Sequence, residues 1–239
     1  MIYLTSFHAI EEHILAEKSS GMLLVAKTSP RALELVALAT RYHIRVNRTG
    51  TVELNRLAPD NRGIALALES GTIMLTLEHF IESLDARERA IVVMLDSIND
   101  PHNYGAILRS CDQFGVDLVV TRTRRSAHNA KSVAQTSAGA VAWVPHCETP
   151  NLNRAVEKLK NAGFWIYGAD MRGEKIYTKE FSGRVTLILG NEGTGLSRLL
   201  AECCDALVAI PTVGQLDSLN VSVAAGIFLY EFVRQNNSH

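Results

Sequence analysis

The chain has 239 residues, 47% of them hydrophobic, which excludes a disordered protein and allows one large or two modest domains around a real core. With 24 basic and 25 acidic residues it has no overall charge that indicates a nucleic-acid partner, so such a partner would need a local cluster of cations. The four cysteines lack metal-ligand spacing, and neither a signal peptide nor an apolar run of roughly 20 residues is present, which predicts a cytoplasmic protein with reduced thiols and no membrane partner.

The first 77 residues are expected to form a small α/β domain. Apolar residues at helical spacing predict a helix over 7–15. Ser29 as a cap followed by Pro30 at the first helical position predicts a second helix that ends near Tyr42. The predicted strands of this domain are 22–26, 44–46 and 64–68.

A charged, mildly helical connector over 78–89 is expected to separate this domain from a second one, over 90–239. In the second domain, apolar strands alternate with helices, which predicts a parallel sheet with helices on both faces. Its predicted strands are 90–95, 116–120, 142–144, 164–167, 185–189 and 206–210, and its predicted helices are 104–114, 129–135, 152–162 and 218–231.

One loop of the second domain has the composition of a binding site. The strand 185–189 ends in residues 190–196, Gly-Asn-Glu-Gly-Thr-Gly-Leu. Three glycines at a strand end allow positive φ angles and close approach of a ligand to the backbone. Their spacing is not that of a dinucleotide-binding fingerprint.

Three stretches of this domain, taken together, resemble the three motifs of the SpoU/TrmH family of S-adenosylmethionine-dependent RNA 2′-O-ribose methyltransferases. They are DSINDPHNYGAILRS (96–110), GNEGTGL (190–196) and SLNVSVAAG (218–226). The resemblance extends from Ile91 to Arg234 and is strongest to the branch that modifies a guanosine of 23S ribosomal RNA. It implies a SPOUT fold with a deep trefoil knot at the C-terminal end, and a homodimer through this domain.

The N-terminal domain resembles the ribosomal-protein-like RNA-binding domain of some family members. The matching points are Phe7-His8-Ala9 and Arg62-Gly63-Ile64-Ala65. Where many relatives have a His-Gln-Gly turn, this chain has Asn61-Arg62-Gly63. Apart from this difference, the resemblance to an RNA-binding domain implies that the N-terminal domain recruits the RNA substrate.

Two candidate catalytic residues lie in the first motif. Locally, Asn103 has the features of a helix N-cap, and Arg109 those of a surface arginine paired with Asp112. The resemblance implies that Asn103 organises the active site and that Arg109 acts on the 2′-hydroxyl. Because a guanidinium does not readily lose its proton, bidentate binding of the adjacent RNA phosphate is the role we prefer for Arg109.

Three further candidates come from the other two motifs. Glu192 has the local interpretation of a surface residue that caps the next helix, and Ser218 and Asn220 that of caps for the helix that follows them, in competition with Asp217. The resemblance instead implies active-site roles for all three.

The resemblance also implies how the methyl donor is held. Gly190, Ile210 and Leu219 match family positions that bind S-adenosylmethionine largely through backbone atoms. Methyl transfer from a sulfonium needs no metal, so none is expected. A 2′-hydroxyl acceptor excludes DNA as the substrate.

A local cluster of cations is the predicted RNA-contacting segment. It consists of Arg122, Arg124, Arg125 and Lys131, and no acidic residue follows until Glu148. A solvated loop is the alternative interpretation, but the cluster follows a strand on the expected ligand side of the sheet.

Three alternatives stay open at this point. The first is an enzyme that methylates a transfer-RNA ribose. The second is an RNA-binding protein that kept the fold and lost the activity. The third is a phosphate-binding α/β enzyme that uses residues 190–195, although no lysine or aspartate fingerprint supports it.

Overall fold

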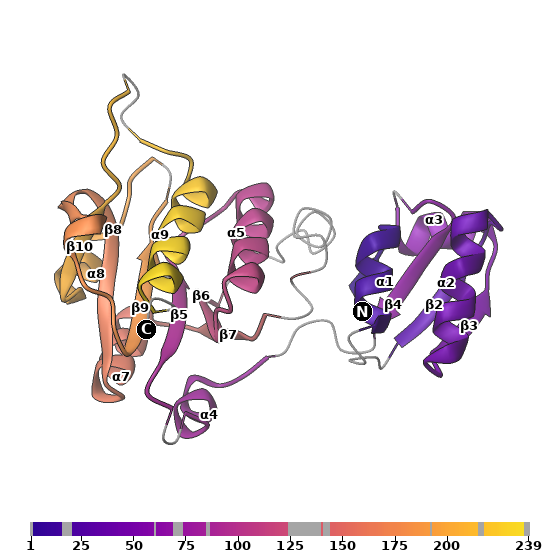
Figure 1. The fold of residues 1–239 in the computed structure, drawn as a ribbon, viewed down its shortest axis with the longest axis horizontal. Coiled ribbons are helices and arrows are strands. Elements are labelled where there is room, and N and C mark those ends of the chain that lie inside the picture. Colours follow the sequence, from indigo (N-terminus) through magenta and orange to yellow (C-terminus); the bar gives the residue numbers. More distant parts are fainter. Residues whose placement is uncertain are drawn as a thin grey trace.

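The structure is a computed structural model that describes residues 2–15, 21–59, 61–68, 74–84, 87–123, 140, 144–191, 193–214 and 218–236. The described chain forms two units, each around its own sheet (Figure 1). The N-terminal unit has a mixed sheet of four strands, and the C-terminal unit has a parallel sheet of six.

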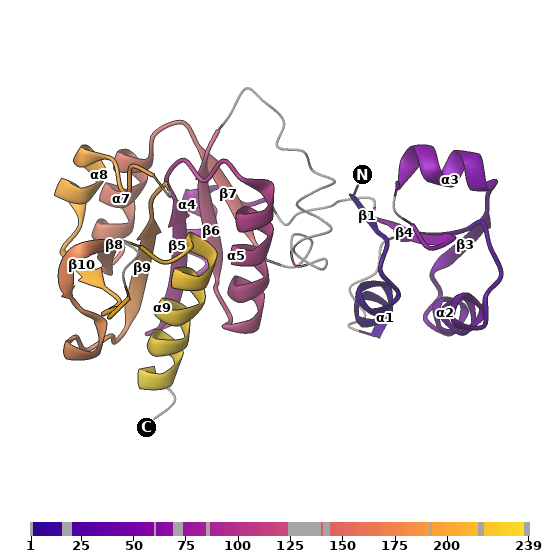
Figure 2. The ribbon, with the colours of Figure 1, turned by 90° about the horizontal axis from the view of Figure 1, so that it is seen from above.

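The N-terminal sheet has the order β1-β4-β2-β3, with only β2 and β3 parallel. Its strands are β1 (Ile2–Leu4), β2 (Gly21–Val25), β3 (Arg45–Arg48) and β4 (Ile64–Leu68). Two helices, α1 (Phe7–Leu15) and α2 (Pro30–Arg41), cover one face, and α3 (Thr51–Leu57) covers the other (Figure 2). Since both faces are covered, all five residues of β4 are buried.

Most elements of this unit were predicted from the sequence. The helix over 7–15 is confirmed, and the hydroxyl of Ser29 caps α2 by accepting the Ala32 amide at 3.2 Å. Two short elements, β1 and α3, were not predicted. A three-residue strand has too few positions to show alternation, and α3 starts after Gly50 without a side-chain cap.

The C-terminal sheet has the order β10-β8-β9-β5-β6-β7, and all its pairings are parallel, as predicted. Its strands are β5 (Ala90–Leu95), β6 (Leu118–Arg122), β7 (His146–Thr149), β8 (Phe164–Lys175), β9 (Arg184–Leu189) and β10 (Ala206–Ala209).

Helices cover both faces of this sheet, which confirms the predicted architecture. Helices α5 (Pro101–Gln113) and α9 (Val221–Asn236) pack on one face, together with the single-turn helix η2 (Ile176–Thr178). Helices α4 (Leu77–Glu82), α7 (Leu152–Asn161) and α8 (Arg198–Cys203) pack on the other (Figures 1 and 2). The chain leaves β10 at one edge of the sheet and returns to place α9 beside α5.

The segment predicted as a connector contributes to the C-terminal unit. Leu77, Phe80 and Leu84 are buried against the same face as α7 and α8, and Glu78 pairs with Lys158 of α7. Helix α4 is thus packed onto the six-stranded sheet, even though its exposed side is charged.

Several other predicted boundaries differ from the structure. The strand predicted at 116–120 is β6 at 118–122, and the helices predicted at 104–114 and 218–231 are α5 at 101–113 and α9 at 221–236. The edge strand is β7 at His146–Thr149, because the apolar run at 142–144 precedes the residues that pair with β6. Strand β8 is longer than predicted. Its pairing with β10 jumps from Gly168 opposite Leu207 to Glu174 opposite Val208, an interruption that strand periodicity does not reveal. The predicted helix at 129–135 lies outside the described residues.

Candidate active site

The carboxyl ends of three strands and the starts of two helices meet at one edge of the C-terminal sheet. Asp96 directly follows β5, Gly190 directly follows the neighbouring strand β9, and Ile210 directly follows β10. Open parallel sheets bind their ligands outside this edge. Helices α5 and α9 also begin here, so all three motif regions converge at this edge of the sheet.

The glycine loop, residues 190–195, is closed on itself. Asn191 and Gly195 exchange two backbone hydrogen bonds of 3.0 and 2.8 Å. The side-chain oxygen of Asn191 accepts the amide of Gly193 at 2.9 Å. A Cβ added to Gly190 would lie 2.3 Å from the carbonyl carbon of Gly195, so only glycine fits at this position. Gly195 has φ +67°, a conformation that side chains disfavour.

Both ends of the glycine loop are tied to the end of β5. The amide nitrogen of the Asn191 side chain donates to the carbonyl of Ser97 at 3.0 Å. The backbone amide of Ser197 donates to the buried carboxylate of Asp96 at 3.1 Å. Ser97 has φ +65°, which is unusual for a residue other than glycine and is typical of functional sites.

A second set of contacts joins the first motif to the third. The side-chain oxygen of Asn103, which is 9% exposed, accepts the side-chain amide of Asn220 at 3.0 Å, across 117 positions of sequence. The Asn220 oxygen in turn accepts the amide of Ser222 at 2.9 Å, so Asn220 caps α9 as its local interpretation predicted. The N-cap interpretation of Asn103 is wrong, because Asp100 caps α5 by accepting the His102 amide at 3.0 Å.

Arg109 lies away from this edge. It is exposed, six residues after Asn103 along α5, which is about 9 Å along the helix axis. Its guanidinium makes no hydrogen bond or ion pair with any residue that the structure describes, so the pairing with Asp112 is not formed. Asp112 instead accepts the side-chain amide of Gln113 at 3.2 Å.

The remaining predicted residues divide into two groups. Gly190 is buried, Ile210 is half-buried against the core, and Ser218 and Leu219 are exposed just before α9. Arg122 is exposed at the end of β6, with its guanidinium 3.9 Å from the Asp96 carboxylate. Predictions for Glu192, Arg124, Arg125 and Lys131 lie outside the described residues.

Sequence reasoning gave no role to three residues of this edge, Asp96, Ser97 and Asn191, although the first two motifs contain them. The available signal was positional. Asp96 and Ser97 are the first polar residues after the apolar strand β5, at the end of the strand where ligand sites form.

The inner face of α5 carries no reactive group. Burial raises the pKa of the Cys111 thiol and of the Tyr104 phenol well above their usual values, so both stay neutral and form part of the core. Across the described ranges, no group of His, Cys, Asp and Glu side chains could hold a metal ion. Nor is any helix in those ranges long and apolar enough to cross a membrane.

The residues at the carboxyl edge fit a nucleoside methyl donor. Ile210 and Leu219 supply apolar side chains, and the stretches beside them, 210–214 and 218–220, are outside helices and strands, which leaves main-chain donors and acceptors for a ligand. Residues 190–195 contain no lysine or arginine, so the loop lacks the cation of a phosphate-binding loop.

Comparison with known proteins places this arrangement in a family. Residues 90–230 match the sequence model of the SpoU rRNA Methylase family. The chain is 41% identical over 220 residues to an uncharacterized tRNA/rRNA methyltransferase of Borreliella burgdorferi, a match that covers 88% of this chain and 96% of the relative. It is also 41% identical over 210 residues to the 23S rRNA (guanosine-2′-O-)-methyltransferase RlmB of Xanthomonas campestris, covering 87% and 84%.

Solved structures have the same fold over both units. The SpoU methyltransferase AviRb of Streptomyces viridochromogenes, solved with AdoMet, has a TM-score of 0.75 at 24% identity and covers 99% of this chain and 91% of that chain. The AdoMet-bound rRNA methyltransferase of Sinorhizobium meliloti has a TM-score of 0.73 at 21% identity, covering 97% and 86%.

Proposed function

Because this chain belongs to the SpoU rRNA methylase family and is an RNA 2′-O-ribose methyltransferase of that family, we propose that it methylates a guanosine ribose of 23S ribosomal RNA. The methyl donor in this proposal is S-adenosylmethionine, which is bound in two structures of similar fold. The observation that carries the proposal is the Asn103–Asn220 bond, which joins the first and third motifs at the carboxyl edge of the sheet.

The choice of ribosomal RNA is supported by the extent of the sequence match. The family model begins at residue 90, whereas the match to the Xanthomonas enzyme covers 87% of the chain and so must extend well into the N-terminal unit. That unit is the part in which substrate choice is expected to differ between branches. A relative named for one RNA and similar in both units therefore favours that RNA.

In the proposed reaction, some residues of the chain bind the methyl donor and another binds the RNA. Bound S-adenosylmethionine would supply a methyl group on a good leaving group. Gly190, Ile210 and Leu219 would hold it through main-chain atoms and apolar contact, while the Asn103–Asn220 pair fixes the starts of α5 and α9 beside it. Arg109 would bind the phosphate next to the target ribose and favour the developing alkoxide.

A homodimer is the second part of the proposal. Leu219, just before α9, and Val223, Ile227 and Tyr230 within it are between 37% and 57% exposed and recur at intervals of three or four residues. An apolar stripe of this kind is a binding face rather than a solvated one. The stripe lies beside α5, and Phe114, directly after α5, contacts Tyr230 edge-on. The exposed Arg109 therefore belongs to the same helix pair.

A dimer through this face would explain why Arg109 lies away from its own glycine loop, since the partner chain's loop could receive it. We expect Ile227→Asp to give a monomer by light scattering that retains its fold and loses methyl transfer. Leu33→Asp, on the exposed side of α2, is the matched control and should change neither property. An active Ile227→Asp monomer would contradict the proposed dimer.

The trefoil knot belongs to the same proposal. Helix α9 packs against α5 on one side and is hydrogen-bonded to the segment between β8 and β9 on the other. There, the Gln235 side chain accepts the Phe181 amide at 2.8 Å and donates to the Lys179 carbonyl at 2.9 Å. This returning path of the last helix supports a threaded chain. Pulling the unfolded chain by its ends should give an extension short of the full contour length, and a full-length extension would exclude the knot.

For the N-terminal unit we propose RNA binding at one end of its sheet. The Gly63 carbonyl accepts the amides of Ala26 and Lys27, and the Val25 carbonyl accepts the amide of Thr49. These bonds gather three exposed cations, Lys27, Arg48 and Arg62, at the same end, and none of them forms an ion pair with a described residue. Together with the segment from Arg122 to Lys131, they would contact RNA phosphates.

The test is transfer of labelled methyl from S-adenosylmethionine to unmodified total RNA, fractionated by size and mapped for 2′-O-methyl ribose. Label on a guanosine of large ribosomal RNA is the expected result. Label in transfer RNA would favour the second candidate, a transfer-RNA methyltransferase, which the name of the Borreliella relative also allows. No label with either RNA would overturn the proposal. A cytoplasmic location, where both RNAs occur, is part of the same proposal.

A further inference from the structure

The side chain of Asp96 is buried, and the chemistry proposed above gives it no role. It is 3% exposed, directly after β5. A carboxylate is costly to bury unless its charge and its lone pairs are compensated. The Asp96 carboxylate accepts hydrogen bonds from the Ser197 amide at 3.1 Å and the Ser97 hydroxyl at 3.2 Å, and the Arg122 guanidinium lies 3.9 Å away.

These contacts connect the carboxylate to the glycine loop. Ser197 follows the loop directly, and its amide is held by Asp96. At the other end, Asn191 donates to the carbonyl of Ser97, whose hydroxyl donates to Asp96. The positive φ of Ser97 turns the chain at the end of β5. The corner formed by Asp96 and Ser97 therefore fixes both ends of the loop.

We infer that Asp96 is a positioning residue for the methyl donor. It holds the glycine loop against β5 in the shape that binds the donor, and Arg122 supplies its counter-charge. The inference rests on the proposed function, since it requires that the loop bind S-adenosylmethionine. According to this inference, the affinity for the donor depends on the Asp96 carboxylate, although Asp96 acts through the glycine loop and does not contact the donor.

Two other aspartates form the same kind of contact elsewhere and separate this role from stability. Asp117 accepts the Ile91 amide at 2.8 Å and pairs with Arg87 at 3.0 Å. Asp205 accepts the Ile166 amide at 2.8 Å and pairs with Lys160 at 2.6 Å. Each joins two parts of the sheet, as Asp96 does, but neither bonds to the glycine loop. Asp117→Asn and Asp205→Asn are thus matched controls for the loss of such a contact.

The experiment compares Asp96→Asn, Asp96→Ala and the two controls in the full chain. Thermal unfolding without ligand measures stability, and calorimetric titration with S-adenosylmethionine and with its demethylated product measures affinity. We expect Asp96→Ala to weaken donor binding by about tenfold or more, the size of one lost buried hydrogen bond. Asp96→Asn, which keeps an acceptor for the Ser197 amide, should recover part of that loss. Both controls should unfold earlier and bind within about twofold of wild type.

Steady-state kinetics gives a second readout. With Asp96→Asn, KM for the donor should rise more than kcat falls, because a saturating donor restores the loop shape. Arg122→Gln, assayed for donor binding without RNA, should weaken it less than Asp96→Ala does.

Several outcomes would overturn the inference. Asp96 variants that are as destabilised as the controls but bind the donor as wild type does would make Asp96 a purely structural residue. If Asp96→Ala does not fold, the isosteric Asp96→Asn variant alone tests the inference. Donor binding by Asp96→Asn at wild-type strength would then contradict it. A wild-type chain that binds no S-adenosylmethionine would be a different result, since it removes the proposed function itself.

Discussion

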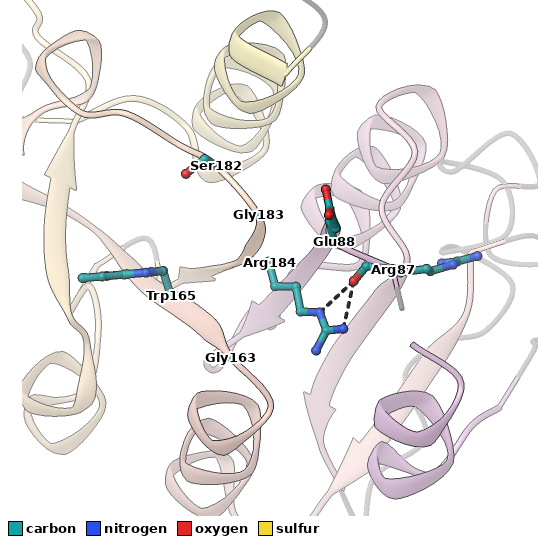
Figure 3. A pocket seen from close by; sticks show the side chains of 7 residues that line it. All are labelled: Arg87, Glu88, Gly163, Trp165, Ser182, Gly183 and Arg184. Carbon is teal, nitrogen blue, oxygen red and sulfur yellow. Dashed lines mark hydrogen bonds between the residues drawn. The ribbon is translucent and has the colours of Figure 1, made fainter. Parts of the chain in front are cut away.

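The two edges of the six-stranded sheet differ in what their polar contacts connect. At the amino edge, an open groove lies between the starts of β5, β8 and β9 (Figure 3). Its lining residues are Arg87, Glu88, Gly163, Trp165, Ser182, Gly183 and Arg184. At the carboxyl edge, Asp96 and Asn191 tie the glycine loop to the end of β5, and Asn220 joins the start of α9 to α5.

The polar groups of the amino edge mostly hold strand ends together. The Arg184 guanidinium donates to the carbonyl of Arg87 at 2.8 and 3.1 Å (Figure 3). It also donates to the carbonyl of Ala162 at 2.7 Å. Arg87 itself pairs with Asp117. The guanidinium of Arg184 therefore joins its own turn to the turns at Arg87 and Ala162. Arg109 on α5, in contrast, is exposed and makes no bond to the described residues. A hollow in the surface is therefore a weaker guide to function than converging side chains.

The largest expected effect separates these two arginines. Arg109→Ala should lower kcat by about a thousandfold or more, the loss typical of a group that stabilises transition-state charge, with donor affinity within a few-fold. Arg184→Ala should leave kcat unchanged and lower the free energy of unfolding by about 1 kcal/mol, because the carbonyls of Arg87 and Ala162 lose their donor. Single-turnover methyl transfer and chemical denaturation measure the two quantities. Equal loss of donor binding and catalysis in Arg109→Ala would instead assign that arginine to the fold or the donor site.

A pair of glycines gives the next comparison. Gly190→Ala places a Cβ 2.3 Å from the Gly195 carbonyl carbon, so the glycine loop must open and donor binding should fall by about a hundredfold. Gly163 at the amino edge has φ +83° but open space around a Cβ. Gly163→Ala should cost only the backbone strain, about 1 kcal/mol of stability. Calorimetry and thermal unfolding test the pair, and donor binding by Gly190→Ala at wild-type strength would argue against the loop as the donor site.

A smaller effect is expected from the helix caps. Asn220→Ala removes a cap worth about 1 kcal/mol together with the bond to Asn103, so kcat should fall by about tenfold to a hundredfold. Asn151 caps α7 by accepting the Arg154 amide at 3.2 Å, on the opposite face of the sheet. Asn151→Ala should lose a similar amount of stability with full activity. If both variants keep full activity, Asn220 is a cap and nothing more.

These comparisons also explain what the sequence could predict. Strands such as β5 and β9, and helices α1, α2 and α7, follow from hydrophobic periodicity and cap residues, which are local. The cap of α5 was misassigned because Asp100 and Asn103 are both competent N-caps, and spacing alone does not choose between them.

The contacts of the carboxyl edge depend on distant residues. Asp96 meets Ser197 across 101 positions, and Ser97 meets Asn191 across 94. No local pattern specifies such a pair. The motif resemblance identified Asn103 and Asn220 because it carries information that periodicity does not, but it gave no role to Asp96, whose function is expressed only through the loop it holds.

The smallest effect on donor binding and catalysis is expected at His146, which begins β7 away from the glycine loop. It is 5% exposed, its Nδ1 lies 2.6 Å from the Val144 carbonyl, and its Nε2 has no partner within the described part of the chain. Burial lowers the pKa of this histidine to about 4. The unfolded chain, with a histidine pKa near 6.5, therefore binds more protons between pH 4 and 6.5.

The free energy of unfolding includes the full contribution of the neutral His146 ring above about pH 6.5. As the pH falls from 6.5 to 4 this contribution is lost, and the free energy of unfolding drops by about 3 kcal/mol near pH 4. Because His146 makes no contact with the glycine loop, donor affinity per folded molecule should not follow this loss. We expect His146→Phe to unfold with a flatter dependence on pH between 4 and 6.5, measured by denaturant titration. An unchanged slope in His146→Phe would mean that the ring is protonated in the folded chain, and it would remove His146 as the cause of the acid sensitivity.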